Sequence, residues 1–160
     1  MGSSDGDGKA QFSARQKAKD MTFTVLGHCP DTNQIGIGIT TASIAVGGLC
    51  PFYTAAGDII SSQAFARPEL GLLASRHLTS GGSLSELEPV LGEADADFQY
   101  RQVAVIRRTG ERWVHSGISC RPWSGHLMGN SCAVMGNFLA GSTTVEAMLE
   151  AFENAGSVPL

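Results

Sequence analysis

Charged residues are scarce in this sequence. Asp, Glu, Lys and Arg make up 16% of its 160 residues, whereas a typical soluble domain has about 25%. With so few charged residues, less of the surface can be covered by groups that water solvates well. This favours a homo-oligomer that buries one face against another copy. The net charge is −4 and the 11 Lys and Arg residues form no basic stripe, so we expect no nucleic-acid partner.

Long hydrophobic runs and closely spaced cysteines are also missing. No stretch approaches the roughly 18 apolar residues of a membrane span, and the N-terminus lacks the layout of a signal peptide. The four cysteines, at positions 29, 50, 120 and 132, form no C-x-x-C pair and have no spacing suited to zinc. We therefore expect no membrane partner, no metal or other cofactor, free thiols and a cytoplasmic location.

The residues that are present describe one globular domain. An apolar fraction of 42% over 160 residues is enough for a real core. Residues 1–20 are rich in Gly, Ser, Asp and Lys without a sustained apolar period, so we interpret them as a flexible leader or an expression remnant. The folded domain is predicted to span residues 21–160.

The order of the predicted elements indicates the fold class. Alternating and β-branched residues predict strands, and apolar residues at helical spacing behind a proline or a capping box predict helices. Strands are predicted at 22–26, 35–39, 50–56, 58–64, 100–106, 113–116 and 133–135, and helices at 68–78, from 83 onward and from 142 to about 156. This order indicates an α+β (layered α/β) fold. It also fits the front part of an αββα sandwich, whose last strands would be absent or supplied by another subunit.

Several short blocks follow one another through residues 21–160. They include Thr22-Phe23-Thr24-Val25, Ser62-Gln63-Ala64-Phe65, Tyr100-Arg101-Gln102-Val103, Ser116-Gly117, Gly125-His126 and Gly136-Asn137. With these blocks the chain resembles the uncharacterised family called domain of unknown function 1028, which is placed with the N-terminal nucleophile (Ntn) hydrolases. The resemblance implies an αββα sandwich of the Ntn-hydrolase type.

Thr22 is the candidate nucleophile that this resemblance implies. Ntn hydrolases use a Thr, Ser or Cys that is the first residue of the processed chain, because its own α-amine activates the side chain. An α-amine has a pKa of about 7.7–8.0, which suits a base at neutral pH. The role requires that Met21 and the leader are removed, or that translation begins at Met21. The alternative is an ordinary strand threonine.

Further candidates for catalysis lie near the end of the chain. The Asn137 side chain and backbone N–H groups near Gly136 would donate hydrogen bonds to a developing oxyanion. His126 would orient the substrate or transfer a proton, since its charge is adjustable near neutral pH. The alternatives are a turn residue for Asn137, a tight turn for Gly136 and a structural hydrogen bond for His126.

Substrate binding is assigned to Arg101, Gln102 and Gln63, together with Gly136. A planar guanidinium suits a substrate carboxylate, and a buried glutamine must find hydrogen-bond partners. The alternative for these side chains is structural hydrogen bonding between strands. Asp95, at a helix end, is expected to be solvated rather than catalytic.

The sequence thus predicts a hydrolase of Ntn type that cleaves a C–N (amide-like) bond of a small metabolite. One alternative is a hydrolytic deaminase of an imine or enamine, which needs a positioned water but no free N-terminal threonine. Another is a non-catalytic ligand-binding or assembly module, because a fold alone does not establish a reaction.

Overall fold

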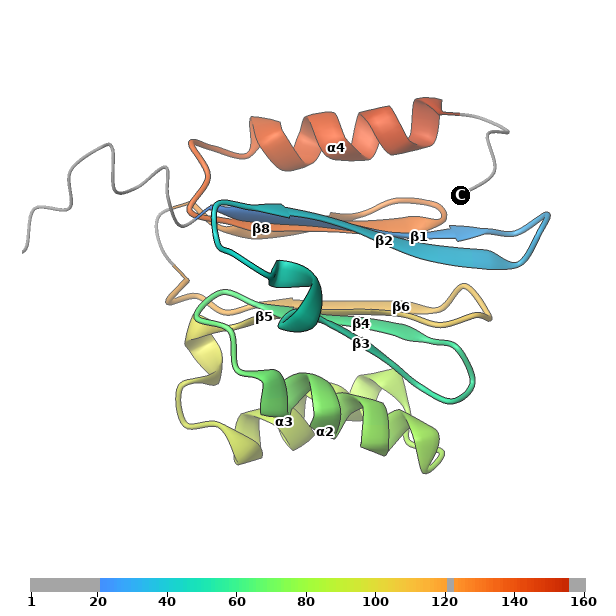
Figure 1. Ribbon diagram of the computed structural model, residues 1–160, viewed down its shortest axis with the longest axis vertical. Helices are drawn as coiled ribbons and strands as arrows, with labels where there is room; N and C mark the ends of the chain where they lie inside the picture. The colour runs from blue at the N-terminus through green and yellow to red at the C-terminus, as the bar shows by residue number, and fades with distance from the viewer. Residues whose placement is uncertain (1–20, 121–122, 156–160) are drawn as a thin grey trace, which may run out of the picture.

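The computed structural model describes residues 21–120 and 123–155, and these form two antiparallel four-stranded sheets and three α-helices. The sheets lie face to face, with one helix on the outer side of the first sheet and two on the outer side of the second (Figure 1). The α+β class predicted from the sequence is confirmed, and the layers run helix, sheet, sheet, helices.

The first sheet has the order β2-β1-β8-β7. Its strands are β1 (Thr22–Cys29), β2 (Gln34–Thr41), β7 (Gly125–Met128) and β8 (Cys132–Asn137). β1 and β2 form a hairpin whose turn places Asn33 at a φ of 54°, a left-handed conformation that asparagine tolerates. In this sheet β1 lies between β2 and β8. Every residue of β8 is buried.

The second sheet has the order β3-β4-β5-β6. Its strands are β3 (Pro51–Tyr53), β4 (Ile59–Gln63), β5 (Gln102–Ile106) and β6 (Arg112–Ser116). The two central strands, β4 and β5, are buried along their whole length, because one face meets the first sheet and the other meets the helices. Polar residues on these strands must therefore find hydrogen-bond partners inside the protein.

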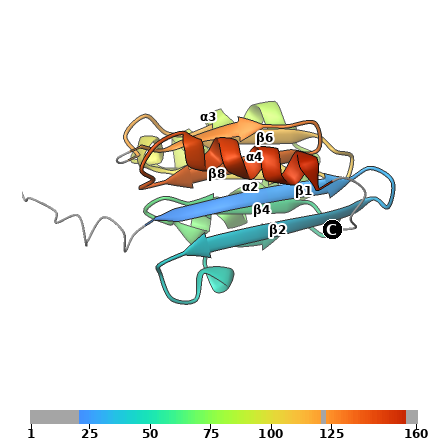
Figure 2. The same ribbon diagram turned by 90° about the horizontal axis from the view of Figure 1, so that it is seen from above.

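Helices cover the outer faces. α2 (Pro68–Thr79) and α3 (Leu87–Ala94) pack on the second sheet, and α4 (Thr143–Asn154) packs on the first. Seen from above, α4 leaves β2 to one side (Figure 2). The capping box predicted at Ser83 is present and opens the 3-10 helix η2 (Leu84–Glu86) that leads into α3.

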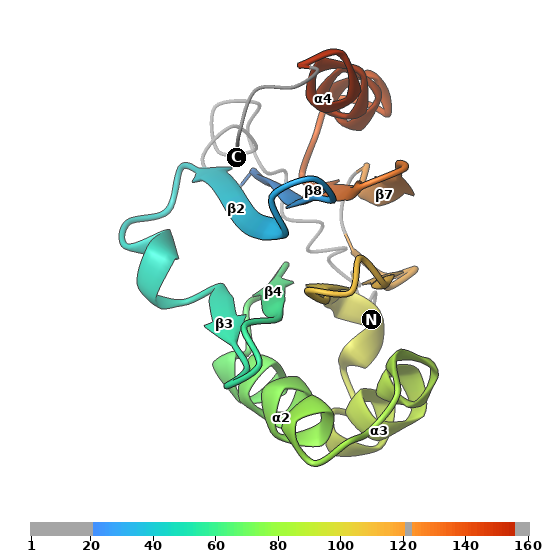
Figure 3. The same ribbon diagram turned by 90° about the vertical axis from the view of Figure 1, so that its right-hand side faces the viewer.

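A second 3-10 helix, η1 (Val46–Gly48), lies in the segment that crosses from β2 in one sheet to β3 in the other. Figure 3 shows this segment along one side of the sandwich. Between the sheets the core consists of Leu26, Ile59, Ala104, Ile106 and Met135. A third short helix, η3 (Phe98–Tyr100), precedes β5.

Most elements agree with the sequence predictions, with differences at their ends. Predicted strands 50–56 and 58–64 are shorter in the structure, and the strand predicted from 100 begins at Gln102 because η3 occupies the preceding residues. β7 was not predicted, since its four residues show no alternation. The leader assigned to residues 1–20 lies outside the described residues. None of the described helices has the length and apolar character needed to cross a membrane.

Candidate active site

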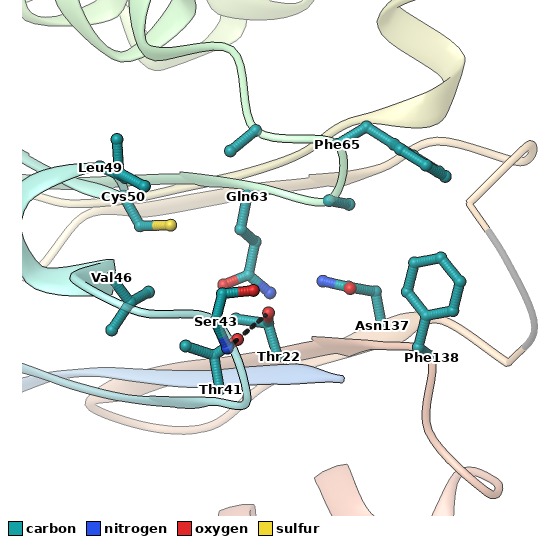
Figure 4. A pocket seen from close by; sticks show the side chains of 12 residues that line it. Thr22, Thr41, Ser43, Val46, Leu49, Cys50, Gln63, Phe65, Asn137 and Phe138 are labelled. Atoms are coloured by element: carbon teal, nitrogen blue, oxygen red, sulfur yellow. Dashed lines mark hydrogen bonds between the residues drawn. The ribbon is translucent and has the colours of Figure 1, made fainter. Parts of the chain in front are cut away.

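A cavity of about 330 Å³ opens between the sheets, where β1 begins and β2, β4 and β8 end (Figure 4). Antiparallel pairing places the start of β1 between the ends of β2 and β8, and the packing of the two sheets brings the end of β4 to the same end of the sandwich. The cavity is lined by Thr22, Thr41, Ser43, Val46, Leu49, Cys50, Gln63, Ala64, Phe65, Ala66, Asn137 and Phe138.

Thr22 occupies the middle of one cavity wall. As the first residue of β1 it pairs with Thr41 of β2 on one side and with Asn137 of β8 on the other. The side-chain oxygens of Thr22 and Thr41 are 3.0 Å apart. The Thr41 oxygen also accepts a hydrogen bond from the backbone N–H of Ser43 at 3.2 Å. Thr22 is only 8% exposed, so its hydroxyl is held in one place by its neighbours.

Three buried side-chain amides, Asn137 beside Thr22 in the first sheet and Gln63 and Gln102 in the second, form a hydrogen-bonded network next to the cavity. Nε2 of Gln102 donates to the carbonyl oxygen of Gly136 at 2.8 Å. Because a carbonyl oxygen only accepts, this bond fixes which end of the Gln102 amide is the nitrogen. Oε1 of Gln102 must then be an acceptor, and it receives hydrogen bonds from Gln63 Nε2 at 3.0 Å and from Asn137 Nδ2 at 2.9 Å.

The orientation of the network continues from there. Gln63 presents Oε1 to the hydroxyl of Thr24, which donates to it. Asn137 uses one of its two Nδ2 hydrogens on Gln102, and within the described residues its other hydrogen and its Oδ1 have no side-chain partner. Asn137 therefore carries one donor and one acceptor that a ligand in the cavity can use.

The backbone is strained directly beyond the two amides that line the cavity. Ala64 and Phe65, which follow Gln63, have φ values of 60° and 47°, and Phe138, which follows Asn137, has a φ of 55°. Left-handed backbone costs about 1–2 kcal/mol at a residue with a side chain. Such conformations tend to be kept where a site needs them. The side chains of Phe65 and Phe138 pack edge to face at 5.7 Å across the cavity mouth.

Within the described residues, the lining of the cavity includes no Asp, Glu, Lys, Arg or His. The one titratable side chain in the lining is Cys50, and burial raises the pKa of its thiol, which keeps it protonated near neutral pH. The described residues also contain no cluster of three or more His, Cys, Asp or Glu suited to a metal ion.

Arg101 does not line this cavity. Its Nε donates to Asp95 Oδ2 at 2.8 Å and its Nη1 donates to the carbonyl oxygen of Phe65 at 2.6 Å. The expectation that Asp95 is solvated is wrong, because its side chain is 3% exposed and also binds Arg67. Burial by itself would raise the pKa of Asp95, but hydrogen bonds from Arg101, the Asp97 backbone and Arg67 hold it below the usual value.

His126 and Gly136 also lie away from the cavity. His126, on β7, has its Nδ1 3.0 Å from Ser116 Oγ, which in turn accepts from Gln102 Nε2 at 2.9 Å. Burial, with a smaller contribution from His115, lowers the pKa of His126. Gly136 lies inside β8 and supplies the carbonyl that orients Gln102.

The structure thus brings Thr22, Gln63 and Asn137 together in the cavity and places Gln102 directly behind them. Sequence reasoning missed Thr41, which touches Thr22 only through the register of β1 and β2. It also missed the aromatic residues of the cavity mouth. The signal that could have found Phe138 is its position directly after Asn137.

Comparisons with known proteins agree with one another. A crystal structure of protein SPO2555 from Silicibacter pomeroyi, itself assigned to DUF1028, superposes with a TM-score of 0.79 at 28% sequence identity. The match covers 88% of this chain and 64% of that one, so this chain spans less than two thirds of its length. No curated protein matches the sequence. The model of the family of unknown function DUF1028 matches residues 22–160. The chain therefore belongs to DUF1028.

Proposed function

We propose that this protein is an Ntn-type hydrolase that cleaves an amide-like C–N bond of a small metabolite, with Thr22 as its nucleophile. The observation that carries the proposal is the position of the Thr22 side chain, which lines a cavity beside the amides of Gln63 and Asn137. The sequence of layers, with two sheets between helices, fits the Ntn type that the resemblance implies.

The α-amine of Thr22 is the proposed base. It becomes available once the peptide bond between Met21 and Thr22 is cleaved, and it then lies next to its own hydroxyl at the start of β1. The family match includes Thr22 as its first residue. A pKa of about 7.7–8.0 leaves a useful fraction of such an amine unprotonated at neutral pH.

The proposed reaction has two halves. Oγ1 of Thr22 attacks the amide carbon while its proton moves to the α-amine, and the carbonyl oxygen becomes an oxyanion. The C–N bond then breaks, the departing nitrogen takes the proton from the amine, and the acyl group stays on Thr22 as an ester. Water attacks this ester with the amine again acting as base, which releases the carboxylic acid and restores Thr22.

Two neighbours assist in this scheme. The free Nδ2 hydrogen of Asn137 donates to the oxyanion, and donors placed in advance of the reaction are strong contributors to catalysis. Either hydroxyl can donate across the contact between Thr22 and Thr41, and in the proposed scheme Thr41 donates its hydroxyl hydrogen to Thr22 Oγ1 while its own oxygen accepts from the Ser43 backbone. That direction leaves the proton of Thr22 free to move to the amine.

Intact-mass analysis and N-terminal sequencing of the full chain as isolated test the proposal. We expect a mature form that begins at Thr22 and releases amine from members of an amide panel. Thr22→Ala should abolish turnover, Thr22→Ser should retain part of it, and Thr40→Ala, an exposed change on β2, should leave it unchanged.

Each contrary result has a definite meaning. Turnover by a chain that retains residues before Thr22 would refute the Ntn mechanism. Turnover of an imine that survives in Thr22→Ala would favour the hydrolytic deaminase. Binding of amides without turnover, in a chain that does begin at Thr22, would favour a ligand-binding module.

A further inference from the structure

We infer that the cavity selects a small carboxamide with an uncharged, apolar acyl chain and excludes substrates whose acyl chain carries a carboxylate or an ammonium group. As a statement about the substrate, this inference rests on the proposed function. As a statement about binding, it follows from the lining of the cavity and can be measured separately.

The polar side chains of the cavity are suited to binding an amide. Hydroxyl groups come from Thr22, Thr41 and Ser43, and amide groups come from Gln63 and Asn137. Each hydroxyl can donate or accept, and Asn137 keeps one donor and one acceptor free of the internal network. A carboxamide presents the complementary pair, a carbonyl oxygen and an N–H.

Apolar side chains flank these polar groups on both sides. Val46 and Leu49 approach from η1 and the residue after it, and Phe65 and Phe138 approach from the two strained turns. Figure 4 shows these side chains around the polar group formed by Thr22, Thr41 and Ser43. A volume of about 330 Å³ lies at the lower end of the range for small-molecule sites, about 300–1,000 Å³. The cavity as a whole is therefore large enough for a carboxamide with an acyl chain of moderate length.

The charged side chains next to Phe65 of the cavity lining already have partners. Arg101 is committed to Asp95 and to the carbonyl oxygen of Phe65, and Arg67 binds the same carboxylate at 2.8 Å. A carboxylate or an ammonium group on the acyl chain would lie among the apolar side chains, away from the Thr22 α-amine of the processed chain. It would lose water without gaining an oppositely charged side chain from the described lining. Burying an unpaired charge is strongly unfavourable.

Three amides with the same six-carbon chain test the inference: hexanamide, which is neutral, adipamate, which carries a carboxylate, and 6-aminohexanamide, which carries an ammonium group. Binding to the full chain is measured by ligand-observed NMR titration, and turnover is measured separately as released ammonia. We expect hexanamide to bind at least about tenfold more tightly than either charged amide, as the loss of water from an unpaired charge requires.

A matched pair of variants places a cation at the cavity or away from it. Leu49 lines the cavity and is 45% exposed, so a lysine there can keep its amine in water while it reaches the ligand. Leu72 is 48% exposed on α2 and does not line the cavity. Leu49→Lys should tighten adipamate binding by about tenfold relative to hexanamide, at the level of one added charge contact, and Leu72→Lys should leave the ratio unchanged.

The results separate the inference from the proposed reaction. Hexanamide that binds preferentially without being hydrolysed would support the inference and count against the reaction. Adipamate or 6-aminohexanamide that binds as tightly as hexanamide would overturn the inference, whether or not it is hydrolysed. Failure of all three amides to bind would overturn it as well, since the cavity would then not recognise the carboxamide group.

Discussion

Replacing Gln102 by Glu should make the stability of the protein depend on pH in a way that the wild type does not show. Gln102 is fully buried, and its Nε2 donates to the carbonyl oxygen of Gly136 at 2.8 Å and to Ser116 Oγ at 2.9 Å. A carboxylate at this position would direct an oxygen at the Gly136 carbonyl. Only the protonated carboxyl group can still donate to it, so folding should raise the pKa of the new side chain.

The size of the effect follows from the unfolded pKa of a glutamate, about 4.3. A carboxyl group whose pKa is raised by folding does not change the unfolding free energy at a pH where it is protonated in both the folded and the unfolded protein. The unfolding free energy falls as the pH rises above the pKa of the group in the unfolded protein. About 2.7 pH units separate that value from pH 7, at about 1.36 kcal/mol each. A carboxyl group that stays protonated in the folded state up to pH 7 therefore lowers the unfolding free energy there by about 3.7 kcal/mol, in addition to about 1 kcal/mol for one lost hydrogen bond. Near pH 4 the pH-dependent part almost vanishes and about 1 kcal/mol remains.

Urea unfolding at pH 4, 5, 6 and 7 measures this difference. The comparison with wild type at each pH cancels groups that both proteins share, such as Asp95. Gln34→Glu is the control, because it makes the same chemical change at an exposed residue of β2 and should show almost no pH-dependent loss. A difference between Gln102→Glu and wild type that stays constant from pH 4 to 7 would refute the proposed direction of the network.

Three further predictions concern the surroundings of the site. Arg101→Met should lower the unfolding free energy by about 3 kcal/mol at pH 7, because Asp95 stays buried with one cation fewer. This loss should become smaller below about pH 4, where Asp95 is protonated and uncharged. Urea unfolding measures both values, and an equal loss at pH 7 and below pH 4 would contradict the prediction. Thr41→Val should lower turnover about tenfold, because it removes one hydrogen bond to the nucleophile. The urea midpoint of unfolding should stay unchanged, which would show that the variant folds normally. Gly117→Ala should lower the unfolding free energy in urea by about 1–3 kcal/mol, because the new Cβ would lie 2.2 Å from a backbone oxygen. Gly36→Ala, whose Cβ would enter open space, should lower it by less than about 1 kcal/mol.

The sequence predicts most elements because their signals are local. The proline at the start of α2 and the capping box at Ser83 each act within one turn of helix, and both are present in the structure. β7 escaped prediction because Gly125–Met128 is short and is held as a strand by its pairing with β8. Neither propensity nor periodicity records such tertiary pairing.

The site could be predicted only in part, for a related reason. Thr22 was identified through the resemblance, and Gln63 and Asn137 through the hydrogen bonds that their amides can make, but the contact between Thr22 and Thr41 depends on strand register. Arg101 was assigned to a substrate carboxylate because its charge is visible in the sequence, whereas the buried Asp95 that occupies it is not recognisable as its partner. The roles of all these residues, the homo-oligomer and the cytoplasmic location stay predictions.

The uncharged amide network has a consequence for how activity would respond to acid and base. The amides of Gln63, Gln102 and Asn137 do not titrate, and the Cys50 thiol in the lining has its pKa raised by burial. In the proposed mechanism the α-amine of Thr22 is therefore the single group of the described cavity lining that changes charge around neutral pH. A plot of turnover against pH would rise through one ionisation to a plateau, instead of the bell-shaped curve of an enzyme with a separate acid and base.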